Sequence, residues 1–114
     1  MSNETDRELM ELAAKAAGMV VEWRERQRCF CYADSPYNVA WNPLTDDGDA
    51  LRLGAKLQLR TLCTNAGASA ESTHRDHPSV FAWGERMDYS DVEASAATRR
   101  AIVRAAAEIG RAMP

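Results

Sequence analysis

The sequence has little excess charge and no long apolar run. Its 114 residues include 14 basic and 17 acidic side chains, which gives a formal net charge of -3. Nonspecific nucleic-acid binding usually needs a clear basic surplus, and a nucleic-acid mimic would carry a denser carboxylate surface. No stretch is long enough to span a membrane, and the first residues do not form a basic and then apolar leader. We therefore expect a protein of the cytoplasm that binds neither membranes nor nucleic acid nonspecifically.

Cysteine is scarce, and the three cysteines form an odd set at Cys29, Cys31 and Cys63. Without a secretory context, reduced thiols are expected. Together with His74 and His77 they could supply zinc, which needs about four converging ligands. A C-x-C pair is not the usual C-x-x-C arrangement, however. We predict no metal and no cofactor, with Cys29 and Cys31 buried on the inward face of a strand and both histidines in a polar loop.

The usual motifs of enzymes are absent. The chain has no phosphate-binding or dinucleotide-binding glycine pattern, and no nucleophile motif surrounds a cysteine or serine. Asp46, Asp47 and Asp49 could hold Mg²⁺, but they lack the spacing of a calcium loop. Acidic residues at a helix start, where they stabilise the helix dipole, are the simpler interpretation. We predict that the protein is not an enzyme, and a minor enzyme with a Cys or Asp centre is the least supported alternative.

Helix and strand signals alternate along the chain, and 46% of its residues are hydrophobic, which favours a single folded domain over residues 1–114. Thr5 and Glu8 fit a capping box, and Thr45 can cap a second helix. Three helices are expected. The first covers residues 6–17, the second covers about ten residues after Thr45, and the third lies in the segment that follows residue 90. The expected strands cover residues 19–23, 29–32, 57–63, 69–74 and 80–83. The order α-β-β-α-β-β-β-α predicts an α+β fold with a mainly antiparallel sheet packed against three helices.

Aromatic rings and arginines are interleaved in the strands and loops. Aromatic planes and guanidinium groups form sites for nucleotide-like ligands through stacking and bidentate phosphate contacts, and they also dominate protein interfaces. The alternative is that the rings fill the core while the arginines are solvated on the surface. The residues predicted to contact a ligand are Arg28, Tyr37, Trp41, Asn42, Arg60 and Trp83, with Trp41 and Asn42 at the lip of the pocket.

Residues 41–53 combine an aromatic-Asn-Pro turn with an acid-capped helix that carries an Ala-Leu pair. This segment, with the helical segments 6–18 and 98–106, resembles small bacteriophage and prophage proteins of the phage α-β-α sandwich type. The resemblance covers roughly half of the chain and leaves out the strand regions 19–38 and 63–89. It implies an accessory phage protein that acts in the host cytoplasm, alters host processes or resists defence, and has no known catalytic residues.

We therefore expect a phage-encoded accessory protein that acts by binding. In one version it sequesters a small nucleotide-type defence signal between its arginine- and aromatic-bearing loops. A homodimer is expected in that case, because the pockets of small domains often form between subunits. In the other version it inhibits a host defence complex, such as a CRISPR effector, through a flat patch of aromatic and arginine side chains.

Overall fold

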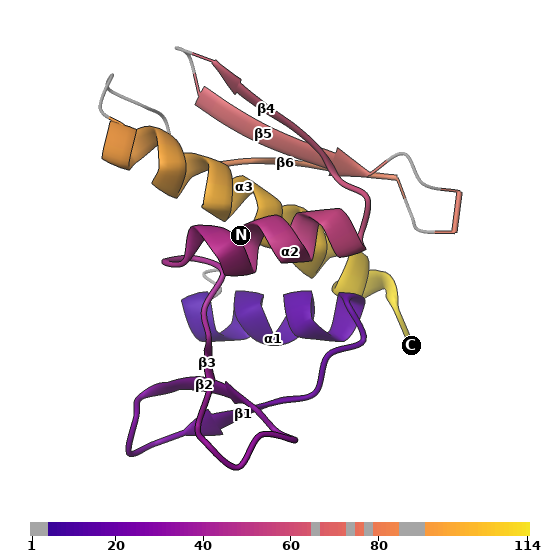
Figure 1. The fold of residues 1–114 in the computed structure, drawn as a ribbon. Coiled ribbons are helices and arrows are strands. Elements are labelled where there is room, and N and C mark those ends of the chain that lie inside the picture. Colours follow the sequence, from indigo (N-terminus) through magenta and orange to yellow (C-terminus); the bar gives the residue numbers. More distant parts are fainter. Residues whose placement is uncertain (1–4, 65–66, 73–74, 77–78, 85–90) are drawn as a thin grey trace.

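The computed structural model describes residues 5–64, 67–72, 75–76, 79–84 and 91–114. Three helices and two three-stranded antiparallel sheets make up the fold (Figure 1). The elements are α1 (Asp6–Ala16), β1 (Val21–Arg24), β2 (Cys29–Tyr32), β3 (Ala40–Trp41), α2 (Asp47–Lys56), β4 (Arg60–Thr64), β5 (Gly67–Ser72), β6 (Val80–Trp83) and α3 (Asp91–Ala112). The predicted α+β class with antiparallel pairing is confirmed, and the two-residue strand β3 adds one strand to the predicted order.

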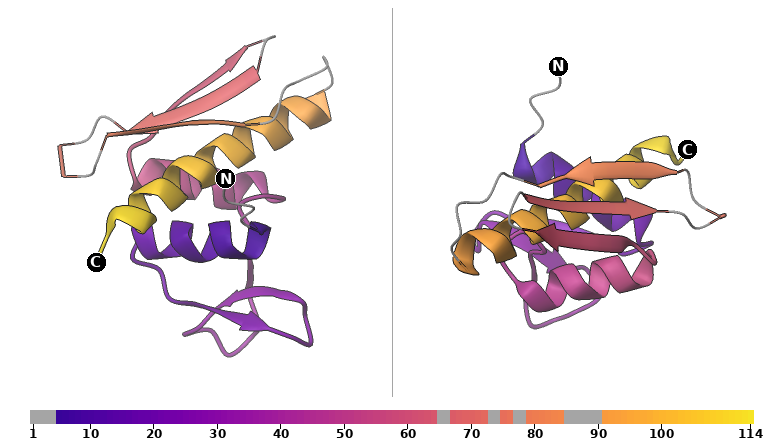
Figure 2. Two further views of the ribbon diagram at one scale, coloured as in Figure 1. Left: turned by 180° about the vertical axis from the view of Figure 1, so that it is seen from behind. Right: turned by 90° about the horizontal axis from the view of Figure 1, so that it is seen from above.

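The helices form a middle layer between the two sheets. Figures 1 and 2 show β1-β2-β3 on one side of the helices and β4-β5-β6 on the other. The layers therefore run sheet, helices, sheet, which differs from the α-β-α order that the resemblance implies. The reason is the second half of α3, which is buried on most sides and so lies at the centre of the fold. The buried hydrophobic residues described in this helix are Ala97, Ala101, Ile102, Val103, Ala105, Ala106, Ala107 and Ile109.

Two glycines allow neighbouring elements to approach α3 closely. A Cβ atom at Gly110 would lie 2.0 Å from the carbonyl oxygen of Leu12 in α1. A Cβ atom at Gly84, directly after β6, would lie 1.9 Å from the carbonyl oxygen of Ala97. Both positions need a residue without a side chain. None of the helices in the described part of the chain has the length and apolar character to cross a membrane.

The first helix begins at the predicted cap. Thr5 Oγ1 accepts a hydrogen bond from the Glu8 N–H at 3.2 Å. The helix ends at Ala16, and Gly18 follows with a φ of +67°, the left-handed conformation that glycine adopts without strain. The sequence therefore predicts both ends of α1 to within one residue.

The predicted cap of the second helix is wrong by one residue. Asp46 and not Thr45 caps α2, and its Oδ2 accepts from the Asp49 N–H at 2.8 Å. The reason is that the turn which begins at Asn42 continues through Thr45. The carbonyl oxygen of Asn42 accepts from both the Thr45 N–H (3.2 Å) and the Asp46 N–H (2.9 Å).

The strand boundaries differ from the predicted ones mainly in the second sheet. The predicted strand 57–63 begins at Arg60, because Leu57 caps the end of α2 and Gln58 has a φ of +55°. The predicted strand 69–74 is β5 (Gly67–Ser72), and positions 73–74 lie outside the described residues. Strands β2 and β6 have the predicted bounds.

Candidate functional site

The six predicted ligand residues lie on the two different sheets, with the helix layer between them. In the first sheet, Trp41 is only 1% exposed and belongs to the hydrophobic core, so it does not line the lip of a pocket. Asn42 follows it, and its Oδ1 accepts from the Leu44 N–H at 3.1 Å. Arg28 lies in the β1–β2 turn with a φ of +53°, and Tyr37 is 83% exposed in the loop before β3.

The other two predicted residues belong to the second sheet. Arg60 opens β4 and forms an ion pair with Glu71 of β5 at 3.8 Å. Trp83 ends β6, is 62% exposed, and contacts Phe81 edge to face with a ring-centroid distance of 5.2 Å. Because of the helices between the sheets, these residues do not form one site with Arg28 and Tyr37 (Figure 1).

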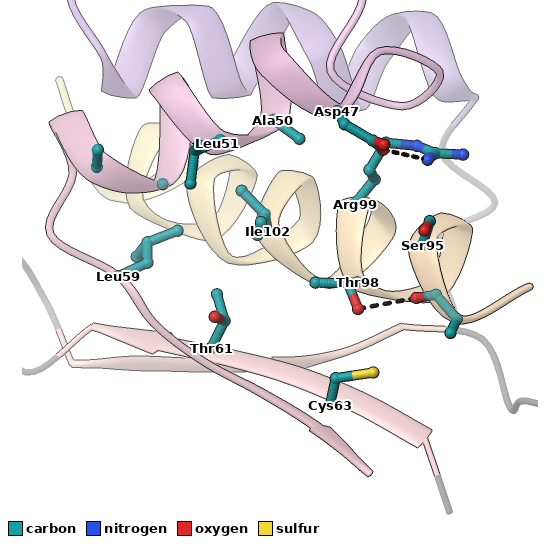
Figure 3. A pocket seen from close by; sticks show the side chains of 13 residues that line it. Asp47, Ala50, Leu51, Leu59, Thr61, Cys63, Ser95, Thr98, Arg99 and Ile102 are labelled. Atoms are coloured by element: carbon teal, nitrogen blue, oxygen red, sulfur yellow. Dashed lines mark hydrogen bonds and ion pairs between the residues drawn. The ribbon is translucent and has the colours of Figure 1, made fainter. Parts of the chain in front are cut away.

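The described residues form a pocket at a place that the sequence does not mark. A cavity of about 450 Å³ lies between α2, β4 and the first half of α3 (Figure 3). The pocket exists because α3 packs mainly against β5 and β6, so that the edge strand β4 lies beside α3 and is not covered by it. Thr61 and Cys63 pair with Ala70 and Ala68 of β5 and therefore share their inward face. The two alanines are buried, whereas Thr61 and Cys63 are exposed.

The pocket has an apolar floor and a polar end. Ile102 of α3, Leu59 before β4, and Ala50 and Gly54 of α2 form the apolar part. The polar end lies where Asp47 of α2 meets α3, as described next. Such a combination of apolar walls and a few polar groups is typical of small-molecule sites.

Arg99 and Asp47 form an ion pair at the polar end. The Arg99 side chain is 16% exposed, and its Nε also donates to the carbonyl oxygen of Leu44 at 2.8 Å. These two contacts fix the guanidinium group in one orientation. Nearby, the Thr98 hydroxyl donates to the carbonyl oxygen of Ala94 at 2.8 Å, so its oxygen can still accept a hydrogen bond from a ligand.

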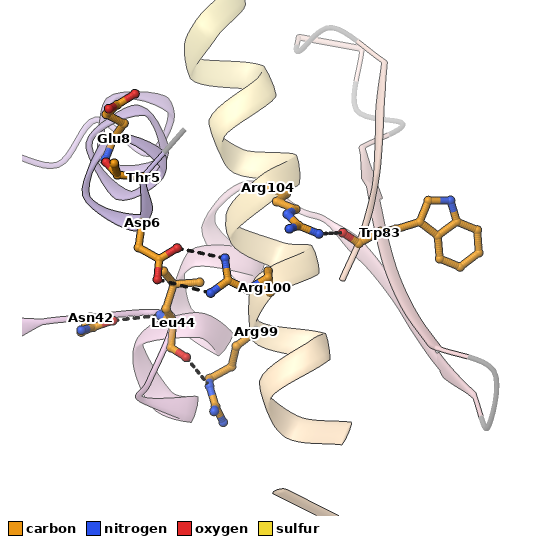
Figure 4. A network of polar contacts seen from close by, with 9 residues as sticks. All are labelled: Thr5, Asp6, Glu8, Asn42, Leu44, Trp83, Arg99, Arg100 and Arg104. Atoms are coloured by element: carbon orange, nitrogen blue, oxygen red, sulfur yellow. Dashed lines mark hydrogen bonds and ion pairs between the residues drawn. The ribbon is translucent and has the colours of Figure 1, made fainter. Parts of the chain in front are cut away.

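Arg99 is one of three α3 arginines that connect this helix to other elements (Figure 4). The hydrogen bonds run from Arg99 to Leu44, from Arg100 to Asp6, and from Arg104 to the carbonyl oxygen of Trp83. Arg100 and Arg104 thus tie α3 to α1 and β6, whereas Arg99 is the one of the three that lines the pocket.

The cysteines are not brought together into one metal site. Cys63 lies in the second sheet, whereas Cys29 and Cys31 lie in the first, beyond the helices. His74 and His77 lie outside the described residues. Within the described ranges, no group of three or more Cys, His, Asp or Glu side chains is placed to hold a metal ion. No histidine is among the described residues that line the pocket beside Cys63, so they include no thiol–imidazole pair for nucleophilic catalysis.

The prediction that Cys29 and Cys31 face inward is wrong. In the β1–β2 register, Cys31 pairs with Glu22 and Phe30 pairs with Trp23. Phe30 is 3% exposed and belongs to the core cluster. Since neighbouring residues of a strand point to opposite faces, the two thiols lie on the outer face of this sheet.

The pocket was missed because its residues carry no unusual motif. Arg99 falls on the mainly apolar side of the last helix, and only its polar character among apolar neighbours could have drawn attention to it. Comparisons of the chain with protein-family models, with curated proteins and with solved structures find no match.

Proposed function

We propose that this chain is a non-enzymatic binding protein, and that its ligand is a small, mainly apolar molecule with one uncharged polar end. The observation that supports this most directly is the α2–β4–α3 pocket. Its volume of about 450 Å³ lies within the range of about 300–1,000 Å³ for small-molecule sites. The ligand's apolar body would contact Ile102 and Leu59, under the exposed inward face of β4.

The polar end of the pocket favours an uncharged ligand group over a phosphate. Asp47 neutralises Arg99, and two of the guanidinium's donors are already used by protein acceptors. A phosphate would therefore gain little net attraction there and would be repelled by the Asp47 carboxylate. A hydroxyl, carbonyl or amide group could still hydrogen-bond with Ser95 or Thr98.

The nucleotide-type defence signal expected from the sequence is proposed as the alternative ligand. The described lining contains one arginine and no aromatic ring, so it offers little of the stacking that such a ligand uses. The role of a phage accessory protein that resists host defence in the host cytoplasm is proposed together with either ligand.

Binding can be tested with neighbouring substitutions on opposite faces of β4. Thr61→Phe would place a ring in the pocket, whereas Leu62→Phe enlarges an exposed side chain on the outer face. The probe is the neutral, polarity-sensitive dye N-phenyl-1-naphthylamine, with a cyclic dinucleotide as the second ligand. We expect the dye to bind one per chain, and its affinity to fall at least about tenfold in Thr61→Phe, which corresponds to about 1.4 kcal/mol, but not in Leu62→Phe.

Two results would overturn this proposal. Dye binding that is unchanged in Thr61→Phe would place the dye elsewhere. Tight binding of the cyclic dinucleotide that Thr61→Phe abolishes, without dye binding, would favour the nucleotide-type ligand instead. Both variants change exposed positions of the same strand, so their circular dichroism and melting temperatures provide a direct check on folding.

A second candidate function is inhibition of a host defence complex, such as a CRISPR effector, through a protein interface. The observation that favours it is the outer face of the second sheet, where Leu62 (61%), Phe81 (53%) and Trp83 (62%) are exposed. Exposed aromatic residues are common centres of binding energy in interfaces. They lie on the two outer strands β4 and β6, and the register places Ser69 of the central strand β5 between Leu62 and Trp83.

The interface candidate predicts that Trp83→Ser abolishes both the capture and the inhibition of a purified defence complex. Val20→Ser is the matched control, because Val20 is 72% exposed but belongs to the other side of the molecule. Size-exclusion chromatography of the same two variants tests whether this face forms the expected homodimer. In that case Trp83→Ser should elute as a monomer and Val20→Ser as a dimer. Equal inhibition by both variants would exclude this face as the binding surface.

A further inference from the structure

Two thiols lie side by side on the outer face of the sheet β1-β2-β3. Cys29 and Cys31 are two positions apart in β2, and their Sγ atoms are 3.9 Å apart. Cys31 is 0% exposed, although it points away from the core that Phe30 enters on the other face. A completely buried thiol beside a partly exposed one, on the outside of a sheet, therefore needs a cover.

Arg24 lies over this face. It is the cross-strand partner of Cys29 and so projects on the same side. Its Nη1 donates to Asn38 Oδ1 at 3.0 Å, which joins β1 to the loop before β3. Its Nη2 pairs with Glu22 at 3.2 Å. The Arg24 Nε atom is buried and has no hydrogen-bond partner in the described part of the chain, which is rare for a buried N–H.

The distance between the sulfurs fits two ligands of one metal ion. Metal–thiolate bonds are about 2.3 Å long, so two sulfurs on one ion are about 3.8 Å apart at a tetrahedral angle and about 4.6 Å apart when the ion lies on the line between them. The observed 3.9 Å lies between these limits. An ion bound to both sulfurs at this distance would have a bent S–metal–S angle, and a linear two-thiolate arrangement would need the sulfurs to move about 0.7 Å further apart.

The number and kind of ligands select the ion. Thiolates favour soft ions, among them Cu(I), zinc and the iron of iron–sulfur clusters. Zinc and iron–sulfur clusters need about four protein ligands, and no third ligand accompanies this pair among the described residues. We propose that Cys29 and Cys31 form a two-thiolate site for Cu(I).

The charges near the thiols suit this ion. Each thiol loses its proton when it binds, so two thiolates and one Cu(I) carry a net charge of -1, and two protons are released. The guanidinium of Arg24 supplies the opposite charge, and its Nε–H can donate a hydrogen bond to a thiolate sulfur. Glu22, the cross-strand partner of Cys31, projects on the same face, and its carboxylate already pairs with Arg24. Burial, followed by the hydrogen bond and charge of Cys31, raises the pKa of the Cys29 thiol, whose proton an ion has to displace.

The test is a titration with Cu(I) under anaerobic conditions, in competition with a chromogenic Cu(I) chelator and without thiol reductants. Cys63→Ser removes the thiol of the other sheet and serves as the reference protein. We expect this reference to bind one Cu(I) per chain, and the Cys29→Ser/Cys63→Ser double variant to lose stoichiometric binding. Cys29 is partly exposed, so its substitution should leave the fold intact, which circular dichroism checks. Binding in the double variant that equals the reference would overturn the proposal, as would a folded reference that binds no Cu(I).

Two further comparisons sharpen the assignment. Arg24→Gln should weaken Cu(I) binding about tenfold, as removal of a group that supports metal ligands commonly does. Arg26→Gln, an exposed arginine in the β1–β2 turn, should leave the affinity unchanged. Zn(II) should bind more weakly than Cu(I) to the reference protein. Tight binding of one Zn(II) together with weak Cu(I) binding would overturn the choice of ion.

Discussion

At the scale of single residues, Asp49 fixes the turn before α2 to the helix itself. It is only 7% exposed, and its Oδ2 accepts from the Asn42 N–H at 2.9 Å. Asp49→Ala would leave this N–H without its acceptor, so we expect the free energy of unfolding to fall by about 1–3 kcal/mol in urea titrations. Asp47→Ala is the control, because that side chain is 75% exposed in its ion pair and should cost less than about 1 kcal/mol. Equal losses would contradict this role for Asp49.

Tyr32, also a single-residue feature, makes stability depend on pH in alkaline solution. Burial and then the negative charge of Asp49 raise the pKa of its phenol above the ordinary value of 10. Above about pH 10 the folded protein therefore binds more protons than the unfolded chain, and its free energy of unfolding falls as pH rises. Tyr32→Phe should flatten this fall between about pH 9 and pH 11 in urea titrations, while Tyr37→Phe, at an 83% exposed position, should not. A slope unchanged in Tyr32→Phe would assign the effect to another group.

At the scale of elements, the contact between α1 and α3 depends on Gly110. A methyl group there would lie 2.0 Å from the carbonyl oxygen of Leu12, so Gly110→Ala must push the helices apart. We expect a loss of about 1–3 kcal/mol or more in the free energy of unfolding. Gly54→Ala is the matched control, because its Cβ would meet only Ile102 at 3.7 Å. As a replacement inside α2 it should stabilise the protein by about 0.5–1 kcal/mol. Similar effects of the two substitutions would argue against the close approach.

Elements were predictable where local signals agree with the final environment. Runs of β-branched and aromatic residues predict strands β2 and β6. The Thr5 cap predicts the start of α1. The strand β3 was missed because two residues are too short to show a pattern. The order of the layers was also not predictable. Periodicity shows which side of α3 is apolar, but alanines on its other sides accept neighbours too, and that follows only from the assembled fold.

At the scale of the whole molecule, the candidate site depends on which elements cover one another. The pocket forms because the edge strand β4 lies beside α3 and is not covered by it, and no residue of β4 indicates this arrangement in the sequence. Conversely, Trp41 and Trp83 look equivalent in the sequence, yet one is 1% and the other 62% exposed. Aromatic and arginine content therefore predicts that a surface could bind something, but not which members of the set share that surface.

The first sheet and the helix α3 should also differ in local stability. In the first sheet, β1 has no buried residue and β3 has only two residues, and Phe30 and Trp41 are its buried members of the core cluster. The middle of α3, in contrast, is completely buried at Val103, Ala105 and Ala106. Native-state hydrogen exchange in low denaturant should show the β1–β3 amides opening at a lower free energy, and with a weaker dependence on denaturant, than the α3 amides. Trp41→Ala should widen this gap, because it removes the largest side chain that anchors the sheet. If the sheet and α3 exchange with the same free energy in both proteins, the molecule unfolds as one unit and the first sheet is not a separate, weaker layer.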